Sequence, residues 1–143
     1  EGVFVGYRYY DFKNMDVLFP FGHGLSYTTF DYSELQIEGD LSKGDLTAKF
    51  KVTNSGKIKG AEAAQLYVQD VKCLTPRPKR GLKGFDKVVL EAGESTVITL
   101  PLNDRSFSYW DNYTNKWRLD PGKFIIHIGS SSRDIRLSSE ISL

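Results

Sequence analysis

The feature that most constrains this chain is a repeated alternation of apolar and polar residues. From about residue 30 onward, apolar side chains recur at every second position within short runs. This period of two is typical of a β-strand with one buried side and one exposed side. The residues expected to face a core are Leu46, Ala48, Phe50, Val52, Ala64, Leu66, Val68, Ile98, Leu100, Leu102, Phe124, Ile126 and Ile128. Between them, the outward positions Gln65, Tyr67 and Gln69 are expected to face water.

Short turn sequences separate these runs. Residues 54–56 (Asn-Ser-Gly), 91–93 (Glu-Ala-Gly), 120–122 (Asp-Pro-Gly) and 129–131 (Gly-Ser-Ser) are residue types that favour tight reversals. We expect about seven or eight short strands at regular spacing and no convincing amphipathic helix. The pattern predicts an all-β fold, an antiparallel β-sandwich with immunoglobulin-like or fibronectin type III-like organisation. Because the chain has a single cysteine, the cysteine pair of an antibody-type domain is missing.

Residues 1–29, which we call the leader segment, do not follow this alternation. They are rich in aromatic residues and glycine, and they begin without a methionine, which suggests a piece of a longer protein. An apolar segment outside a core has to be covered by something. The leader segment either wraps around the sandwich or lies against a neighbouring domain, and the second interpretation is favoured. We therefore predict a junction segment at 1–29 and a sandwich domain at 30–143.

The stretch FPFGHGLSYTTF, residues 19–30, is a candidate catalytic loop. His23 lies between two glycines and Ser26 follows shortly after it, and a histidine beside a serine is the pair used in nucleophilic catalysis. No acid that could orient His23 is adjacent in the sequence. Glycines on both sides indicate more simply that the backbone turns sharply or approaches another surface closely. We interpret His23 as a packing or hydrogen-bonding residue at a domain contact, with contact to a bound sugar as a minor alternative.

A second aromatic cluster consists of Tyr7, Arg8, Tyr9 and Tyr10. Read as a strand, this stretch would place Tyr7 and Tyr9 on one side and Arg8 and Tyr10 on the other. The rings could stack on a sugar or pack against a neighbouring domain. Packing between domains is the favoured interpretation.

The acidic residues offer little support for catalysis by this chain. Hydrolysis of a glycoside generally needs two carboxylates at a defined separation. Asp111 and Asp120 are the acids that stand close to aromatic residues in the sequence. We interpret Asp111 as a turn residue that accepts hydrogen bonds from the neighbouring backbone. The following residues Asn112-Tyr113-Thr114 form a sequon, so Asn112 is a candidate N-glycosylation site.

Charge and composition argue against several further classes of protein. The formal net charge of +1 creates no field that would attract nucleic acid or anionic lipid. No apolar run approaches the roughly 20 residues of a membrane helix. His23, His127 and Cys73 lack the spacing of a structural zinc site, and we expect neither a metal nor a cofactor. A basic patch, interpreted as a solvated loop, comprises Lys72, Arg77, Lys79, Arg80 and Lys83.

Several motifs together resemble one enzyme family. EGVFVGYRYYD (1–11) and LFPFGHGLSYTTF (18–30) resemble the region that leads into the C-terminal domain of glycoside hydrolase family 3. LKGFDKVVLEAGES, LNDRSFSYWD and KWRLDPGKFIIHIGSSSRDIRL resemble the fibronectin type III-like domain that ends many β-glucosidases of this family. The likeness covers nearly the whole chain, in the same order.

The resemblance implies a role without catalysis of its own. In that family the nucleophilic aspartate belongs to a (β/α)8 barrel and the acid/base glutamate generally to an α/β sandwich domain, so this chain is expected to be inactive by itself. It would be an accessory domain that stabilises, and packs against, the preceding catalytic domains. The parent would be a retaining β-glucosidase that acts on terminal non-reducing β-D-glucosyl residues.

The resemblance also leaves alternatives open. A β-xylosidase carries a similar domain, and the chain could instead be a carbohydrate- or surface-binding module. The compartment of the parent protein is undetermined, although secretion is favoured. The residues expected at the contact with the catalytic domains are Tyr7, Tyr9, Phe19, Phe21, Gly22, His23, Gly24, Leu25 and Tyr27.

Overall fold

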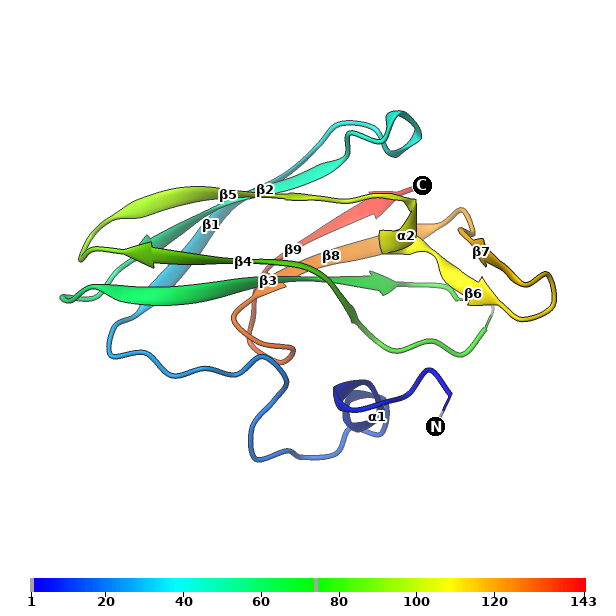
Figure 1. The fold of residues 1–143 in the computed structure, drawn as a ribbon, viewed down its shortest axis with the longest axis horizontal. Helices are drawn as coiled ribbons and strands as arrows, with labels where there is room; N and C mark the ends of the chain where they lie inside the picture. Colours follow the sequence, from blue (N-terminus) through cyan, green and yellow to red (C-terminus); the bar gives the residue numbers. More distant parts are fainter. Residues whose placement is uncertain (1, 74) are drawn as a thin grey trace.

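The chain folds as two antiparallel β-sheets packed face to face, seen in a computed structural model that describes all residues except 1 and 74 (Figure 1). The three-stranded sheet has the order β1-β2-β5, and the four-stranded sheet has the order β4-β3-β8-β9. The strands are β1 (Phe30–Glu38), β2 (Thr47–Asn54), β3 (Gly60–Asp70), β4 (Gly81–Leu90), β5 (Ser95–Pro101), β8 (Lys123–Gly129) and β9 (Ile135–Ser142). The predicted all-β sandwich is confirmed.

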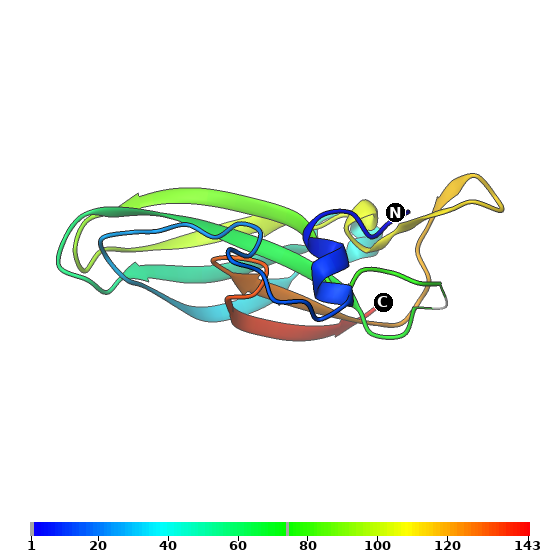
Figure 2. The same cartoon turned by 90° about the horizontal axis from the view of Figure 1, so that it is seen from below.

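Short elements complete the fold. A hairpin of β6 (Tyr109–Asp111) and β7 (Lys116–Arg118) projects from one end of the sandwich (Figure 2). The short helix α2 (Asp104–Phe107) precedes it, and the 3-10 turn η1 (Leu41–Lys43) joins β1 to β2. The sequence pattern did not predict this hairpin, because strands of three residues are too short to show an alternation.

The core consists of the inward rows that the alternation predicted. All thirteen predicted core residues are less than a tenth exposed, and Ala48, Val52, Ala64, Leu66, Ile126 and Ile128 are completely buried. Phe30, Leu90 and Phe107 join them from the strand ends and from α2. The period-two alternation therefore identified the side of each strand that faces the other sheet.

The expectation that Gln65 and Tyr67 face water is wrong. Both side chains lie on the outer side of β3, yet their exposed fractions are 6% and 0%. Tyr67 Oη donates a hydrogen bond of 2.5 Å to Gln65 Oε1. The outward direction was predicted correctly, but the leader segment covers these two residues.

The expectation of a strand at residues 7–10 is also wrong, because this stretch is the helix α1 (Tyr7–Phe12). A single strand would need a sheet edge to pair its backbone groups. A helix satisfies them within the segment, as in the bond from Lys13 N to the Tyr9 oxygen at 2.9 Å. The preceding Gly6, at φ 59°, supplies the bend that starts the helix.

Asn54, at the end of β2, joins three parts of the fold through its completely buried side chain. Its Oδ1 accepts from Thr28 Oγ1 at 2.7 Å and from Gly56 N at 3.1 Å. Its Nδ2 donates to the carbonyl oxygens of Ile58 at 2.8 Å and Leu90 at 2.9 Å. One amide thus ties the leader segment, the β2–β3 turn and the end of β4 together.

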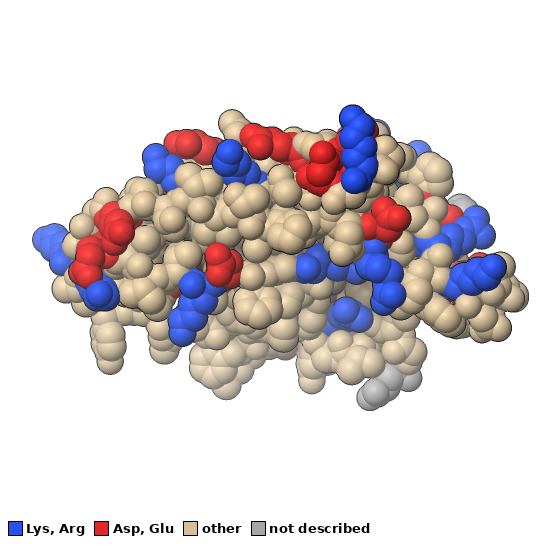
Figure 3. Space-filling view, turned by 45° about the horizontal axis from the view of Figure 1, so that its top comes forward, with Lys and Arg blue, Asp and Glu red and all other residues tan. Residues whose placement is uncertain are grey.

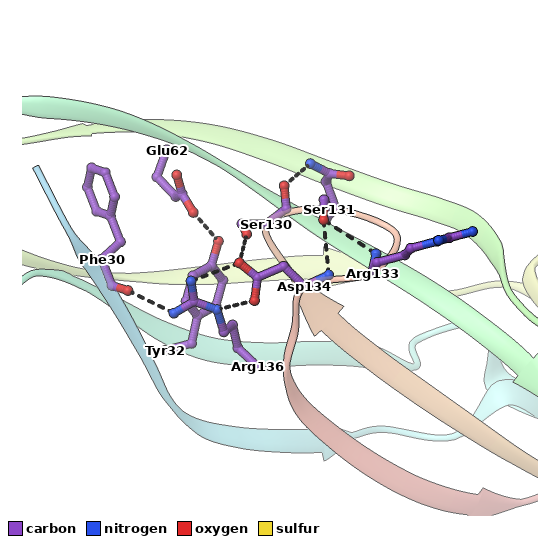
Figure 4. A network of polar contacts seen from close by, with 9 residues as sticks. Phe30, Tyr32, Glu62, Ser130, Ser131, Arg133, Asp134 and Arg136 are labelled. Atoms are coloured by element: carbon purple, nitrogen blue, oxygen red, sulfur yellow. Dashed lines mark hydrogen bonds and ion pairs between the residues drawn. The ribbon is translucent and has the colours of Figure 1, made fainter. Parts of the chain in front are cut away.

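A polar network connects the open edges of the two sheets (Figure 4). Tyr32 Oη on β1 donates to Glu62 Oε1 on β3 at 2.8 Å, and burial, followed by this hydrogen bond, raises the pKa of Tyr32. Arg136 on β9 forms an ion pair with Asp134 at 2.6 Å and donates to the Phe30 oxygen at 3.4 Å. These contacts hold β1 of one sheet against β3 and β9 of the other.

The second histidine of the chain predicts a pH dependence of stability. Nε2 of His127 on β8 lies 2.9 Å from Gln69 Oε1, and Nδ1 lies 2.8 Å from Ser138 Oγ. Burial, and then the nearby Arg80, lower the pKa of His127 from 6.5 to about 4. The unfolded chain therefore binds a proton that the folded chain does not, and we expect the free energy of unfolding to fall as the pH decreases from about 6.5 to about 4.

Urea unfolding at a series of pH values checks this prediction. In His127→Gln the part of the pH dependence that belongs to this interval should disappear, while the contribution of the carboxylates remains. An identical pH profile in both proteins would contradict the assignment.

Candidate functional site

The leader segment has an inner side that is anchored to the four-stranded sheet (Figure 2). The ring of Tyr7 stacks on Phe21 with the centroids 4.5 Å apart and meets Tyr67 edge-on at 6.3 Å. Tyr7 Oη also accepts a hydrogen bond from Leu82 N at 3.0 Å. Tyr7 therefore belongs to the contact between the leader segment and the sandwich.

Gly22 brings the backbone of the leader segment directly onto β3. Its carbonyl oxygen accepts from Gln65 Nε2 at 3.0 Å, and its φ of 80° is a conformation that favours glycine. A Cβ at this position would lie 2.0 Å from Gln65 Oε1. The neighbouring carbonyl of Phe21 accepts from Ser132 N at 2.8 Å. This close approach explains why a glycine stands at residue 22.

Arg133 supplies a further anchor that the sequence analysis did not identify. Its Nε donates to Asp11 Oδ1 at 2.9 Å, and its Nη2 donates to the carbonyl oxygen of Met15 at 2.8 Å. Asp11 on α1 is only 7% exposed. The two residues are far apart in the sequence, and no local pattern indicates the pair.

The outer side of the leader segment carries apolar side chains that none of the described residues covers. Tyr27 is 98% exposed, Leu25 92% and Phe19 65%. Phe19 stacks on His23 with the ring centroids 5.4 Å apart. Such exposure of large apolar residues on one short segment is typical of a surface that packs against something else.

Strand β4 extends this apolar surface. Phe85 and Val89 are 67% and 57% exposed, and they stand next to Gln65 and Ala61 in the pairing with β3. The leader segment crosses this outer face at Gln65, where Gly22 lies, and Thr28 then lies against Gly60 at the start of β3. We call this surface the outer patch, which comprises Phe19, Leu25, Tyr27, Phe85 and Val89.

On the face shown in Figure 3, lysine and arginine alternate with aspartate and glutamate, and the lower rim consists largely of uncharged residues. Arg77 departs from the expected solvated loop, because it is ion-paired with Asp70 at 2.6 Å and with Asp120 at 3.5 Å. The interpretation of the basic patch as a solvated loop is therefore wrong for Arg77.

The structure places the candidate catalytic residues Asp111 and His23 in a turn and in the exposed leader segment, respectively. Asp111 accepts from Tyr113 N at 2.9 Å and from Thr114 Oγ1 at 2.8 Å, which confirms the predicted turn. These bonds, the first of them to the backbone, lower the pKa of Asp111. His23 makes no hydrogen bond through its side chain to any described residue, whereas Ser26 Oγ accepts from Thr28 N at 3.3 Å.

The described residues also bear on metal binding, membrane insertion and glycosylation. Among the described residues, no group of three histidine, cysteine, aspartate or glutamate side chains could hold a metal ion. No described helix has the length and apolarity to cross a membrane. Cys73 and Asn112 are exposed, and Asn112 lies in the turn of the β6–β7 hairpin. Glycosylation of Asn112 stays a prediction.

Comparison with known proteins identifies the family. Residues 62–132 match the family model described as a fibronectin type III-like domain. The chain is 48% identical, over 99% of its length, to thermostable β-glucosidase B of Acetivibrio thermocellus, and 43% identical to an exo-α-(1→6)-L-arabinopyranosidase of Bifidobacterium breve. It covers 19% of each of these relatives, so it spans about a fifth of their length.

Solved structures agree with this result. The crystal structure of the Bifidobacterium adolescentis GH3 β-glucosidase matches the whole chain with a TM-score of 0.95 and 42% identity, over 21% of that protein. The β-D-glucoside glucohydrolase of Trichoderma reesei matches 99% of the chain with a TM-score of 0.91 and 37% identity, over 22% of its length. The chain therefore belongs to the fibronectin type III-like domains and is an accessory domain of a glycoside hydrolase family 3 protein.

Proposed function

We propose that this domain docks through its leader segment onto the catalytic part of the same protein and stabilises it. The parent would be a retaining β-glucosidase that releases terminal non-reducing β-D-glucosyl residues. Several relatives and solved structures are β-glucosidases, which supports this activity. The exo-α-(1→6)-L-arabinopyranosidase of Bifidobacterium breve is 43% identical to the chain, so a similar domain also occurs in a protein that acts on another sugar.

The observation that carries the proposal is the two-sided leader segment. Its inner side is fixed to the sandwich by Tyr7, Gly22 and Asp11, so its outer side is held in a defined position. On that outer side Leu25 and Tyr27 project almost completely into solvent. A preordered apolar surface binds a partner without a large loss of conformational entropy.

The size of the outer patch suits this role. Burying one large apolar side chain contributes roughly 1.5–3 kcal/mol. The five side chains of the outer patch would together offset much of the entropy lost on docking. Because the chain spans about a fifth of its relatives, the remaining four-fifths of such a protein are the natural occupant of this surface.

The proposal extends the contact predicted from the sequence and divides its residues by side. Phe19, Leu25 and Tyr27 would face the catalytic part, together with Phe85 and Val89 from β4, which the sequence analysis missed. Tyr7, Phe21 and Gly22 instead face the sandwich. Tyr9, His23 and Gly24 are exposed and stay candidates for the docking contact.

A pair of substitutions tests the proposal by comparing the 143-residue chain with the full-length protein. In the chain alone, Leu25→Ser with Tyr27→Ser should change the free energy of unfolding by less than about 0.5 kcal/mol, because both side chains are exposed. In the full-length protein the same change should lower the melting temperature and the soluble yield.

Val97→Ser is the matched control, because Val97 is 54% exposed on β5, in the opposite sheet. Calorimetry of the three full-length proteins gives the comparison. If the double variant melts at the same temperature as the Val97→Ser control, the outer patch is not a docking surface.

A further inference from the structure

The β6–β7 hairpin and α2 lie at the end of the sandwich opposite the β2–β3 turn (Figure 1). A small pocket there is lined by residues of the hairpin, of α2 and of the leader segment. Its volume is about 250 Å³. The strands β3 and β8 contribute Val68 and Phe124 to its walls, and the leader segment contributes Val3 and Arg8. None of these lining residues belongs to the outer patch.

Aromatic rings make up much of the wall. Phe107 and Phe124 are buried and meet edge-on at 5.3 Å. Trp110 and Trp117, on the two strands of the hairpin, meet edge-on with ring centroids 5.7 Å apart, and each is 46% exposed. Half-exposed indole rings beside a pocket offer flat apolar surface to a ligand.

The charged groups around the pocket are mostly positive. Asp70 lies in the wall, but it is ion-paired with Arg77 at 2.6 Å. Lys83 Nζ donates to the carbonyl oxygen of Arg105 at 3.3 Å. The guanidinium group of Arg105 stacks on Trp117, with its Cζ 3.5 Å from the ring centroid. In the described part of the chain, no carboxylate lies within ion-pair distance of Lys83 or Arg8.

The positive groups around the pocket repel one another. Lys83 keeps an exposed surface, but partial desolvation of its ammonium group, followed by the positive charges of Arg8, Arg105 and Arg77, lowers its pKa. In addition, Nε of Arg77 is buried and has no hydrogen-bond acceptor among the described residues. A bound anion would offset the repulsion between these cations and accept their hydrogen bonds.

We propose that this pocket binds a small organic anion in which a carboxylate is attached to a ring. The ring lies against Trp110 and Trp117, and the carboxylate lies between Lys83 and Arg8. Apolar walls with a few convergent polar groups are typical of small-molecule sites, and the basic groups select a negative charge. The same chemistry occurs in sugar acids and in aromatic acids, so the experiment has an arm for each.

The two tryptophans make the pocket directly observable. They are the only tryptophans of the chain, so both indole N–H resonances in a ¹H–¹⁵N spectrum report on this pocket. The 143-residue chain is titrated with D-glucuronate and with 4-hydroxybenzoate, and with D-glucose and benzyl alcohol as the neutral counterparts. We expect at least one carboxylate to shift both indole resonances saturably, and added salt to weaken the effect.

The carboxylate that responds identifies the source, a sugar acid or an aromatic acid. The proposal is overturned if neither carboxylate shifts the indole resonances. The proposal is also overturned if the carboxylate that shifts the resonances and its neutral counterpart give equal shifts, since the site would then not recognise the charge.

A pair of lysine variants tests the role of the charge. Lys83→Gln should weaken carboxylate binding by about tenfold, because a charge-assisted hydrogen bond is lost. Lys87→Gln removes the same charge from the same strand, on the exposed outer side, and should leave the affinity unchanged. Arg8→Gln provides a second test on a different element. Equal affinities in Lys83→Gln, Arg8→Gln and Lys87→Gln would contradict the proposed contacts.

Discussion

Replacing Asn54 with aspartate is expected to lower the free energy of unfolding by about 3–5 kcal/mol. The substitution keeps the shape of the side chain but turns the Nδ2 donor into a negatively charged acceptor. That oxygen would face the carbonyl oxygens of Ile58 and Leu90, which Asn54 Nδ2 now approaches to 2.8 and 2.9 Å. Because the side chain is completely buried, water does not replace the lost hydrogen bonds.

Urea unfolding at neutral pH measures this effect as a lower midpoint. Asn115→Asp is the control, since Asn115 lies exposed in the β6–β7 turn at a φ of 50°. Aspartate tolerates that conformation, and the change should cost less than about 0.5 kcal/mol. If the two variants unfolded at the same urea concentration, Asn54 would not hold the three parts of the fold together.

Replacing Phe124 with alanine is expected to cost about 3–5 kcal/mol of stability. Phe124 on β8 is 1% exposed and packs between the sheets against Phe107 of α2. Its removal would leave a cavity beside the strands that carry the β6–β7 hairpin, because the surrounding backbone is held by the ladders of two sheets.

Phe85→Ala is the same substitution on the outer side of β4. Because Phe85 is 67% exposed, the chain alone should lose less than about 0.5 kcal/mol. Denaturant unfolding of both variants checks the comparison. It measures the denaturant concentration at the midpoint and the slope with which the free energy of unfolding falls with denaturant. A large loss in Phe85→Ala for the chain alone would mean that this ring already packs within the domain and is not available for docking.

The sequence by itself determined the fold class and the members of the core. In a strand, successive side chains point to opposite faces, so the run from Leu46 to Val52 fixes its buried side without knowledge of any partner. The turn sequences separated the strands for an equally local reason, since glycine, asparagine and proline set the backbone angles of a reversal. Motifs along the chain also indicated the family.

Tertiary structure decided what covers each face. The alternation showed that Gln65 and Tyr67 point away from the core, but only the path of the leader segment buries them. The same holds for the hydrogen bonds of Asn54 to Thr28 and Leu90 and for the pair between Arg133 and Asp11. These contacts join segments that are far apart in the sequence, and a local pattern carries no information about the partner. The sequence thus predicts which face of a strand a side chain points to. Which residues it contacts on that face depends on how the whole chain folds.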